Sequence, residues 1–298
     1  MLVAALDTAT LTLSCGLVDL ERGGAPRLRC DRTERTGRAK GQPDEAAPAP
    51  QGAPSNERGF AADTDLERAG GPGGREPKAS VPPEKLTHSA LLPKALVELL
   101  HAVGLEIPDV EAYAIGLGPG SFTGLRIGLA TWKGLAYANR RPIAGASSLA
   151  AMALAAAPGA GDGDVLVPLL DAKKGEVYAG FYRVREGGIV ELADDAALPP
   201  AAVAERVRAV SGGRASGFGE GYDAYAGVLE PGLPRLETEV RTPPAAAVGA
   251  LVAETLLGAS YDPEALFALE PRYVRPSEAE LKFPKGIPPA GGRPGEER

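Results

Sequence analysis

The stretch AIGLGPGSFTGLRIGLA, residues 114–130, carries the pattern on which the fold prediction depends. An apolar run leads into Gly116, Gly118 and Gly120, and a helical pattern begins near Ser121. Glycine tolerates positive φ and lets the backbone approach another group closely. Free N–H groups at the start of a helix attract anions. The stretch therefore predicts a strand, a tight turn and a helix, with a candidate phosphate site at the turn.

The candidate phosphate site does not follow either of two common nucleotide-binding motifs. No Gly-Lys-Ser/Thr follows the turn, as a Walker A loop requires, and the glycine spacing differs from the dinucleotide fingerprint. Ligands collect at strand carboxyl ends in open α/β sheets, so the residues after the first predicted strand join the site. The candidate phosphate-binding residues are Asp7, Thr8, Gly118, Gly120 and Ser121. For Asp7 the alternative is a carboxylate that binds the backbone of its own turn, and for Ser121 it is a helix cap.

Periodic patterns on both sides of this stretch predict an α/β fold with mixed sheets. Strand patterns at 2–6 and 10–19 form a hairpin, with a weaker strand at 27–32. The other expected strands cover residues 109–117, 142–145, 165–170, 176–184 and 189–192. The expected helices cover residues 86–103, 122–139, 147–157, 201–210 and 245–257, and Ser147 is the expected cap of the third. The turn 171–175 follows a buried strand, as the turn 7–10 does, which suggests two related halves.

Changes in composition predict the domain organisation. We expect an N-terminal subdomain at 1–146, a C-terminal subdomain at 147–280 and a loose tail at 281–298. A stretch at about 34–83 is dense in Gly, Pro and charged residues and poor in large apolar ones. Such a segment cannot bury enough surface to offset its chain entropy. We interpret it as a disordered insertion.

A row of glycines continues into the predicted helix 122–139. Gly120, Gly124 and Gly128 recur every four residues and leave one face of the helix bare. Each glycine inside a helix costs about 1 kcal/mol relative to alanine, so the row needs a packing or functional reason. Close approach of another helix is such a reason, and the pattern alone leaves open whether that helix is internal or belongs to a partner.

Composition and charge exclude several classes of protein. The formal net charge of −7 argues against a protein that holds nucleic acid through bulk electrostatics. Two cysteines form no disulfide framework. The N-terminus has no leader pattern, and no apolar run approaches the roughly 20 residues of a membrane span. We therefore expect a cytoplasmic protein without membrane contact.

No catalytic or metal-binding constellation is visible. His88 and His101 are the two histidines, and they lie 13 positions apart on one predicted helix. A helical metal site prefers a spacing of three or four. Ser121 does not lie in a nucleophile elbow. We therefore predict no metal ligands and no catalytic residues.

Five motifs together resemble the TsaB (YeaZ-like) family, whose members are subunits of the machinery that makes threonylcarbamoyladenosine in tRNA. They are ALDTAT at 5–10, THSALLP at 87–93, GLGPGSFTGLRIG at 116–128, DAKKGEVY at 171–178 and EPRYVR at 270–275. The resemblance implies an actin-like ATPase fold of the sugar-kinase and Hsp70 type. In that fold two subdomains contain mixed sheets flanked by helices.

The resemblance also implies a role. Such a chain is a non-catalytic dimerisation subunit of the complex that forms N6-threonylcarbamoyladenosine at position 37 of tRNA. It binds and activates a catalytic paralogue, TsaD, which a small ATPase, TsaE, joins. The chain would meet tRNA through the complex, form a homodimer when alone, and carry no cofactor, with ATP or ADP at the partner interface. The paralogue has a metal-binding His-x-x-x-His, whereas here Leu92 follows His88 at the fourth position.

In the family the partner interface is a helix bundle built from the two helices after the first sheet. On this chain those helices are 86–103 and 122–139, and their apolar and glycine stripes would face outward. The implied interface residues are Leu91, Leu92, Ala95, Leu96, Leu99, Gly120, Gly124, Ile127 and Gly128.

Two other functions compete with this interpretation. One is a metal-dependent threonylcarbamoyl transferase or glycoprotease-like hydrolase, which the missing second histidine disfavours. The other is a small-molecule kinase of the same fold class, which requires a catalytic carboxylate that the sequence does not identify.

Overall fold

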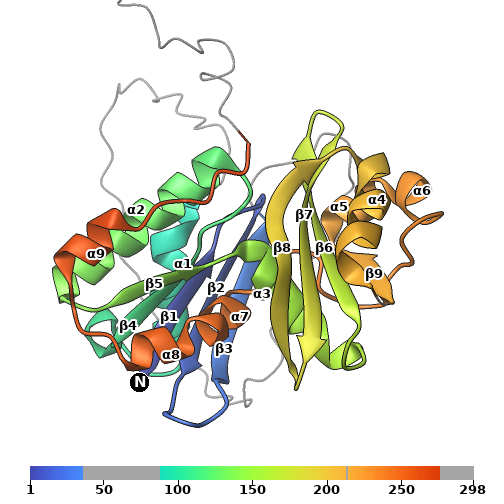
Figure 1. Ribbon diagram of the computed structural model, residues 1–298. Coiled ribbons are helices and arrows are strands. Elements are labelled where there is room, and N and C mark those ends of the chain that lie inside the picture. The colour runs from blue at the N-terminus through green and yellow to red at the C-terminus, as the bar shows by residue number, and fades with distance from the viewer. Residues whose placement is uncertain (36–87, 213, 276–298) are drawn as a thin grey trace, which may run out of the picture. The chain divides into compact units, whose positions relative to one another are not determined.

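The computed structural model describes residues 1–35, 88–212 and 214–275. These residues form two mixed sheets, and helices cover both faces of each sheet (Figure 1). Most of the predicted insertion, the predicted tail at 281–298 and the first residues of the helix expected at 86 lie outside the described residues. No helix in the described ranges is long and apolar enough to cross a membrane.

The first sheet has the strand order β3-β2-β1-β4-β5. Its first three strands form an antiparallel meander, whereas β4 lies parallel to β1 and β5 lies parallel to β4. The strands are β1 (Leu2–Asp7), β2 (Thr12–Asp19), β3 (Arg27–Arg35), β4 (Ala112–Gly116) and β5 (Ile143–Ala146). β1 is buried along its whole length because its sequence, LVAALD, is apolar until its last residue.

The second sheet repeats this topology with the order β8-β7-β6-β9. Its strands are β6 (Val165–Lys173), β7 (Glu176–Arg185), β8 (Gly188–Leu198) and β9 (Ala215–Phe218). As in the first sheet, the first strand of a meander pairs antiparallel with the second and parallel with a later strand. The two halves share one topology, as the repeated turn pattern suggested.

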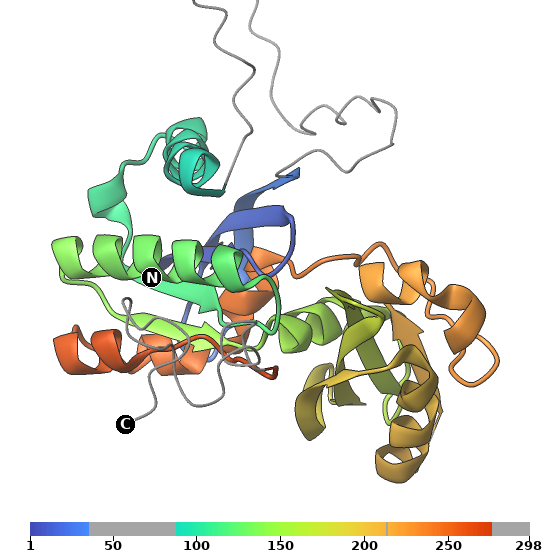
Figure 2. The ribbon, with the colours of Figure 1, turned by 90° about the horizontal axis from the view of Figure 1, so that it is seen from above.

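Helices cover the four sheet faces in groups. One face of the first sheet carries α1 (His88–Ala102), α2 (Phe122–Asn139) and α9 (Pro263–Ala268), and the other carries α7 (Ala245–Leu251) and α8 (Ala253–Leu257) (Figure 2). α3 (Ser148–Ala156) packs on α7 and on β6, β7 and β8. The opposite face of the second sheet carries α4 (Pro200–Ser211), α5 (Glu220–Ala224) and α6 (Ala226–Leu229). The short 3-10 helices are η1 (Ile107–Asp109) and η2 (Ala157–Gly159).

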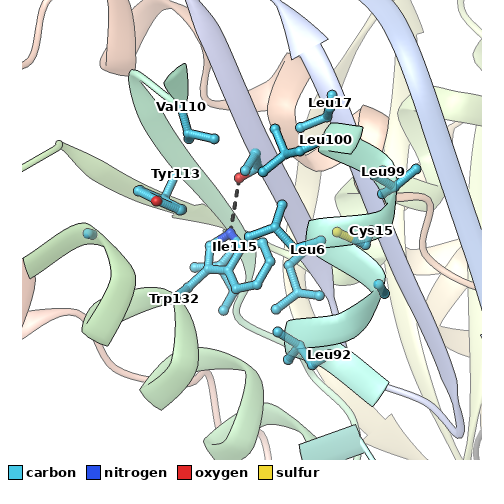
Figure 3. Close-up of a cluster of buried hydrophobic side chains, with 14 of the residues drawn as sticks. Leu6, Cys15, Leu17, Leu92, Leu99, Leu100, Val110, Tyr113, Ile115 and Trp132 are labelled. Atoms are coloured by element: carbon cyan, nitrogen blue, oxygen red, sulfur yellow. Dashed lines mark hydrogen bonds between the residues drawn. The ribbon is translucent and has the colours of Figure 1, made fainter. Parts of the chain in front are cut away.

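The core between α1, α2 and the first sheet is centred on Trp132 (Figure 3). The indole lies edge-on to the Tyr113 ring, with 6.0 Å between ring centroids. Its Nε1–H donates to the carbonyl oxygen of Ala4 at 3.0 Å, so the buried polar atom has a partner. This contact joins α2 to the central strand β1.

The structure corrects the predicted elements at four places. The strand expected at 189–192 is the longer β8, which continues to Leu198. The weak third strand extends to Arg35, so Glu34 and Arg35 belong to β3 rather than to the insertion. The helix expected at 245–257 is two helices that meet at Val252, where φ is −100° and ψ is 8°. No Gly or Pro marks that break in the sequence. The elements β9, α5, α6 and α9 were not foreseen, and each has only four to six residues.

Candidate functional site

The turn after β1 and the glycine-rich turn after β4 meet at one edge of the first sheet. β1 and β4 are parallel, so their carboxyl ends lie side by side. The N–H of Ser121 donates to the carbonyl oxygen of Ala9 at 2.6 Å, and the N–H of Gly118 donates to Ser148 Oγ at 3.1 Å. The structure thus brings the five candidate phosphate-binding residues together.

The glycine row of α2 packs against the chain's own turn. A Cβ atom added at Gly120 would lie 2.1 Å from the Ala9 carbonyl oxygen. At Gly124 it would lie 2.3 Å from the Thr8 carbonyl oxygen, and at Gly128 it would lie 2.3 Å from Thr8 Oγ1. The expectation that this row faces outward to a partner helix is therefore wrong. The close approach is internal, and it is made by a turn rather than by a helix.

Two of the donors that we assigned to a phosphate, the N–H groups of Gly118 and Ser121, already donate hydrogen bonds within the chain. Ser121 caps α2, because its Oγ accepts from the Gly124 N–H at 3.2 Å, and its own N–H is bonded to Ala9. One carboxylate oxygen of Asp7 accepts from the Ala9 N–H at 2.8 Å. Asp7 therefore binds the backbone of its own turn and Ser121 caps a helix, which are the alternatives that the sequence left open.

Asp7 is a buried acid at the end of β1, with 1% of its surface exposed. Loss of solvent raises the pKa of Asp7 to about 7, against the opposing effect of hydrogen bonds from Ser148 Oγ and the Ala9 N–H. The Ser148 hydroxyl donates to the second carboxylate oxygen at 2.6 Å. The carboxyl group therefore connects β1 to the start of α3.

Thr8 gives a first testable prediction about this turn. Its Oγ1 is buried and has no hydrogen-bond partner among the described residues. An unsatisfied buried hydroxyl costs about 1 kcal/mol or more, so Thr8→Val should raise the free energy of unfolding by about 1 kcal/mol. Urea denaturation of the two proteins measures this difference. A loss of stability would mean that the hydroxyl has a partner, such as a bound ligand, in solution.

A second buried acid lies beside the first, on the other sheet. Asp195 of β8 accepts hydrogen bonds from Ser147 Oγ at 2.6 Å and from Tyr182 Oη at 2.7 Å. Burial raises the pKa of Asp195, while the Ser147 and Tyr182 hydrogen bonds oppose that rise. Arg272 Nη1 lies 3.9 Å away. Ser147 is also the predicted cap of α3, since its Oγ accepts from the N–H groups at the helix start.

Ser148 thus binds the buried aspartate of the first sheet, and its neighbour Ser147 binds that of the second. Sequence reasoning found the Ser147 cap but missed Ser148, Tyr182, Asp195 and Arg272 as members of these networks. The pair of serines after a short strand was the feature of the sequence that could have indicated these two networks. Asp195 lay outside the predicted strand 189–192, and its partners are distant in sequence.

The apolar stripe of α1 is part of the core. Leu92, Ala95, Leu96 and Leu99 belong to the cluster around Trp132, and Leu91 is also buried. The expectation that this stripe faces outward is wrong. Leu92, which stands where the resemblance places the paralogue's second histidine, is only 1% exposed and packs in that cluster.

The outer face of α2 is exposed, small and uncharged. It consists of Thr123, Ile127, Ala130, Gly134 and Ala138, all exposed except the half-buried Ile127. Their spacing of three or four residues places them on one side of the helix. A Cβ added at Gly134 would meet nothing within 4 Å. Ile127 is thus the one predicted interface residue on this face, and Gly134 escaped notice because it is out of phase with the inner glycine row.

Side chains that could bind a metal ion do not cluster in the described ranges. No group of three or more His, Cys, Asp or Glu side chains in those ranges could hold a metal ion. His101 is exposed in the last turn of α1. The side chain of His88 lies outside the described part of the chain.

Comparison with known proteins identifies the family. The chain is 35% identical over 199 residues to the tRNA threonylcarbamoyladenosine biosynthesis protein TsaB of Escherichia coli, a match that covers 66% of this chain and 84% of that protein. The chain belongs to the TsaB family. TsaB of Bacillus subtilis is 33% identical over 111 residues, which is 37% of this chain and 47% of that protein. The chain's predicted involvement in threonylcarbamoyladenosine biosynthesis is therefore confirmed.

Solved structures and a family model add to this assignment. YeaZ from Pseudomonas aeruginosa is 25% identical and superposes with a TM-score of 0.59, covering 91% of this TsaB chain and 99% of that one. Another Pseudomonas aeruginosa protein, described as similar to peptidase YEAZ, gives a TM-score of 0.61 at 24% identity, covering 92% and 99% of the two chains. Together with the two flanked mixed sheets, these likenesses confirm the predicted fold class. The model of the TsaD family, tRNA N6-adenosine threonylcarbamoyltransferase, matches residues 79–215.

Proposed function

We propose that this TsaB chain is a non-catalytic subunit that pairs with a TsaD-type catalytic paralogue and activates it. The complex would form N6-threonylcarbamoyladenosine at position 37 of tRNA. The observation that carries the proposal is the outer face of α2, where Gly134 lies exposed in mid-helix with open space around it. A glycine inside a helix costs about 1 kcal/mol, and packing within the described chain does not account for that cost.

The chemistry of this face suits another helix. Small side chains let two helices approach to within about 8 Å of each other, and the five residues of the outer face carry no charge that would be desolvated. The TsaD family model matches the region that contains α1 and α2. A TsaD-type partner would therefore bring a similar pair of helices to the contact. Like elements would then face each other about a local two-fold axis, as in symmetric dimers.

The remaining parts of the proposal concern the wider complex. A TsaE-type ATPase joins the pair in the cytoplasm, and a second copy of this chain occupies the α2 face when the paralogue is absent. A nucleotide at the interface would depend on partner residues, because the N–H groups of Gly118 and Ser121 are bonded within this chain.

The replacement Gly134→Leu tests the proposed pairing. We expect the variant to fold, because leucine is a good helix former and the site is open. We expect its affinity for the TsaD-type partner to fall at least about tenfold, because the side chain blocks close helix packing. Isothermal titration calorimetry with the purified partner gives the dissociation constants.

Gly227→Leu is the matched control. Gly227 lies in α6 on the second sheet, is exposed and also has no neighbour within 4 Å of an added Cβ. The control should bind the partner like the unchanged chain. Equal affinities for all three proteins would refute the α2 interface. Loss of binding in both variants would point to a general effect of added apolar surface.

A second candidate function is transfer of the threonylcarbamoyl group by this chain itself. The match to the threonylcarbamoyltransferase family model favours it, whereas the core leucine at position 92 opposes it. Metal analysis of the purified chain distinguishes the two functions. Stoichiometric iron or zinc together with turnover without the paralogue would establish the second.

A further inference from the structure

The side of α2 that faces α9 carries a line of cations. Arg126 and Lys133 are seven residues apart in α2, so they lie almost on one line along the helix, about 10 Å from each other. Arg140 directly follows the last residue of the helix. Arg126 and Arg140 are exposed and Lys133 is half-buried. α2 itself contains no acidic residue, although the chain as a whole has a net charge of −7. The helix is therefore positively charged in an acidic chain, and the nearby acid Glu270 acts electrostatically on Lys133.

Exposed aromatic rings lie beside these cations at both ends of α2. Near the start of the helix, the rings of Phe122 and Tyr273 have centroids 5.1 Å apart and are 40% and 45% exposed. Near its end, the rings of Tyr137 and Phe267 have centroids 5.7 Å apart and are 54% and 63% exposed. These four account for half of the eight large apolar side chains that are exposed in the described ranges. We call this line of cations and rings the basic ridge.

The segment after α8 holds the ridge in place. α9 lies against α2 (Figure 2), where Lys133 Nζ donates to the Phe267 carbonyl oxygen at 2.9 Å. Farther along, Arg126 Nε donates to Tyr273 Oη at 2.9 Å, while the guanidinium carbon lies 3.8 Å from the centroid of the Phe122 ring. A guanidinium held over a ring keeps N–H groups available for an anion. No carboxylate pairs with Arg126 among the described residues.

We infer that the basic ridge binds RNA directly, with the cations on successive phosphates and the exposed rings against unpaired bases. Cations interleaved with accessible aromatic rings are the combination that binds single-stranded nucleic acid. An apolar protein partner would instead desolvate three charges at a cost. The inference rests on the proposed role in tRNA modification. It extends that role, because the subunit would hold part of the substrate itself instead of leaving this to its partner.

Fluorescence anisotropy with the full-length chain tests the inference. The probes are a labelled, unmodified tRNA transcript with adenosine at position 37, its isolated anticodon stem-loop and a blunt RNA duplex of equal length. The double variant Arg126→Gln and Arg140→Gln removes two charges but keeps polar side chains of similar length. The double variant Arg206→Gln and Arg208→Gln removes two exposed charges from α4, on the second sheet.

We expect the ridge variant to bind the tRNA and the stem-loop about tenfold more weakly, with a salt dependence shallower by about one unit of slope. The α4 variant should bind like the unchanged chain. The duplex should bind more weakly than the stem-loop, because its bases are not accessible to the rings. Equal losses in the two variants would overturn the inference, as would no binding by the unchanged chain at about 100 µM, the weak limit of non-specific binding.

A parallel measurement separates this inference from the proposed pairing. Both variants are titrated with the TsaD-type partner, and the ridge variant should keep its affinity for that partner. If it instead loses the partner while its RNA binding is unchanged, the ridge is a protein contact and the inference fails. If Gly134→Leu leaves pairing intact but the ridge variant loses RNA, the pairing face is wrong and the ridge assignment stands.

Discussion

Gly124→Ala is expected to lower the free energy of unfolding of the isolated chain by about 3 kcal/mol. The added Cβ would lie 2.3 Å from the Thr8 carbonyl oxygen, which belongs to the backbone and cannot rotate away. Either α2 or the turn after β1 must move. Such a movement disturbs the Ser121–Ala9 hydrogen bond and the packing of Trp132 on β1. This cost exceeds the gain of about 1 kcal/mol that alanine brings to a helix.

Gly134→Ala is the matched control for this prediction, because it makes the same chemical change on the same helix. Its Cβ would point into open space, so the helix gain remains and stability should rise by about 1 kcal/mol. Urea denaturation of the three proteins gives both differences. If Gly124→Ala is as stable as Gly134→Ala, the inner glycine row does not pack against the turn in solution.

Much of the fold could be predicted because the local signals agree with one another. The helix Phe122–Asn139 has the predicted bounds. Ser121 caps its start, and its last residue, Asn139, is followed by Arg140 as the C-cap. The strand β1 was recognisable because a short apolar run leads into a polar turn. The short elements α5, α6 and β9 have too few residues to establish a period. The break at Val252 has no Gly or Pro at that position or beside it, so the sequence carries no signal for it.

The candidate site was harder to predict because its contacts are distant in sequence. A row of glycines indicates that another group approaches the helix closely, but it does not identify that group. Here the neighbour is the turn at Thr8, more than a hundred residues away. The apolar stripe of α1 likewise does not show from sequence alone whether it packs on the chain's own core or on a partner. An amphipathic helix usually packs on its own core, and α1 does so here. The outer face of α2 could be recognised only after these inner contacts were known.

The two buried aspartates also illustrate this limit. Ser148 meets Asp7 and Ser147 meets Asp195, across 141 and 48 positions of sequence. Because the two serines are neighbours at the start of α3, each sheet's acid is bound to the same point of the chain. Protonation of either acid therefore changes the contacts of that helix start. This arrangement predicts a stability that depends on pH, and Asp7, whose pKa is raised to about 7 by burial, contributes to that dependence.

Asp7→Asn is expected to remove a loss of stability that the unchanged chain suffers between about pH 4 and about pH 7. Over this range the unfolded chain releases the Asp7 proton at its ordinary pKa of 3.8, whereas the folded chain keeps it until about pH 7. The folded state thus binds more protons, so the free energy of unfolding falls as pH rises, by a total of about 4 kcal/mol. Asparagine stays neutral and can still accept from the Ala9 N–H. Urea denaturation of both proteins at several pH values isolates this contribution, because Asp195 and the other acids are common to both and cancel in the difference. A difference between the two proteins that stays constant with pH would show that Asp7 is ionised in the folded chain throughout the range, and that the hydrogen bonds from Ser148 and Ala9 outweigh its burial.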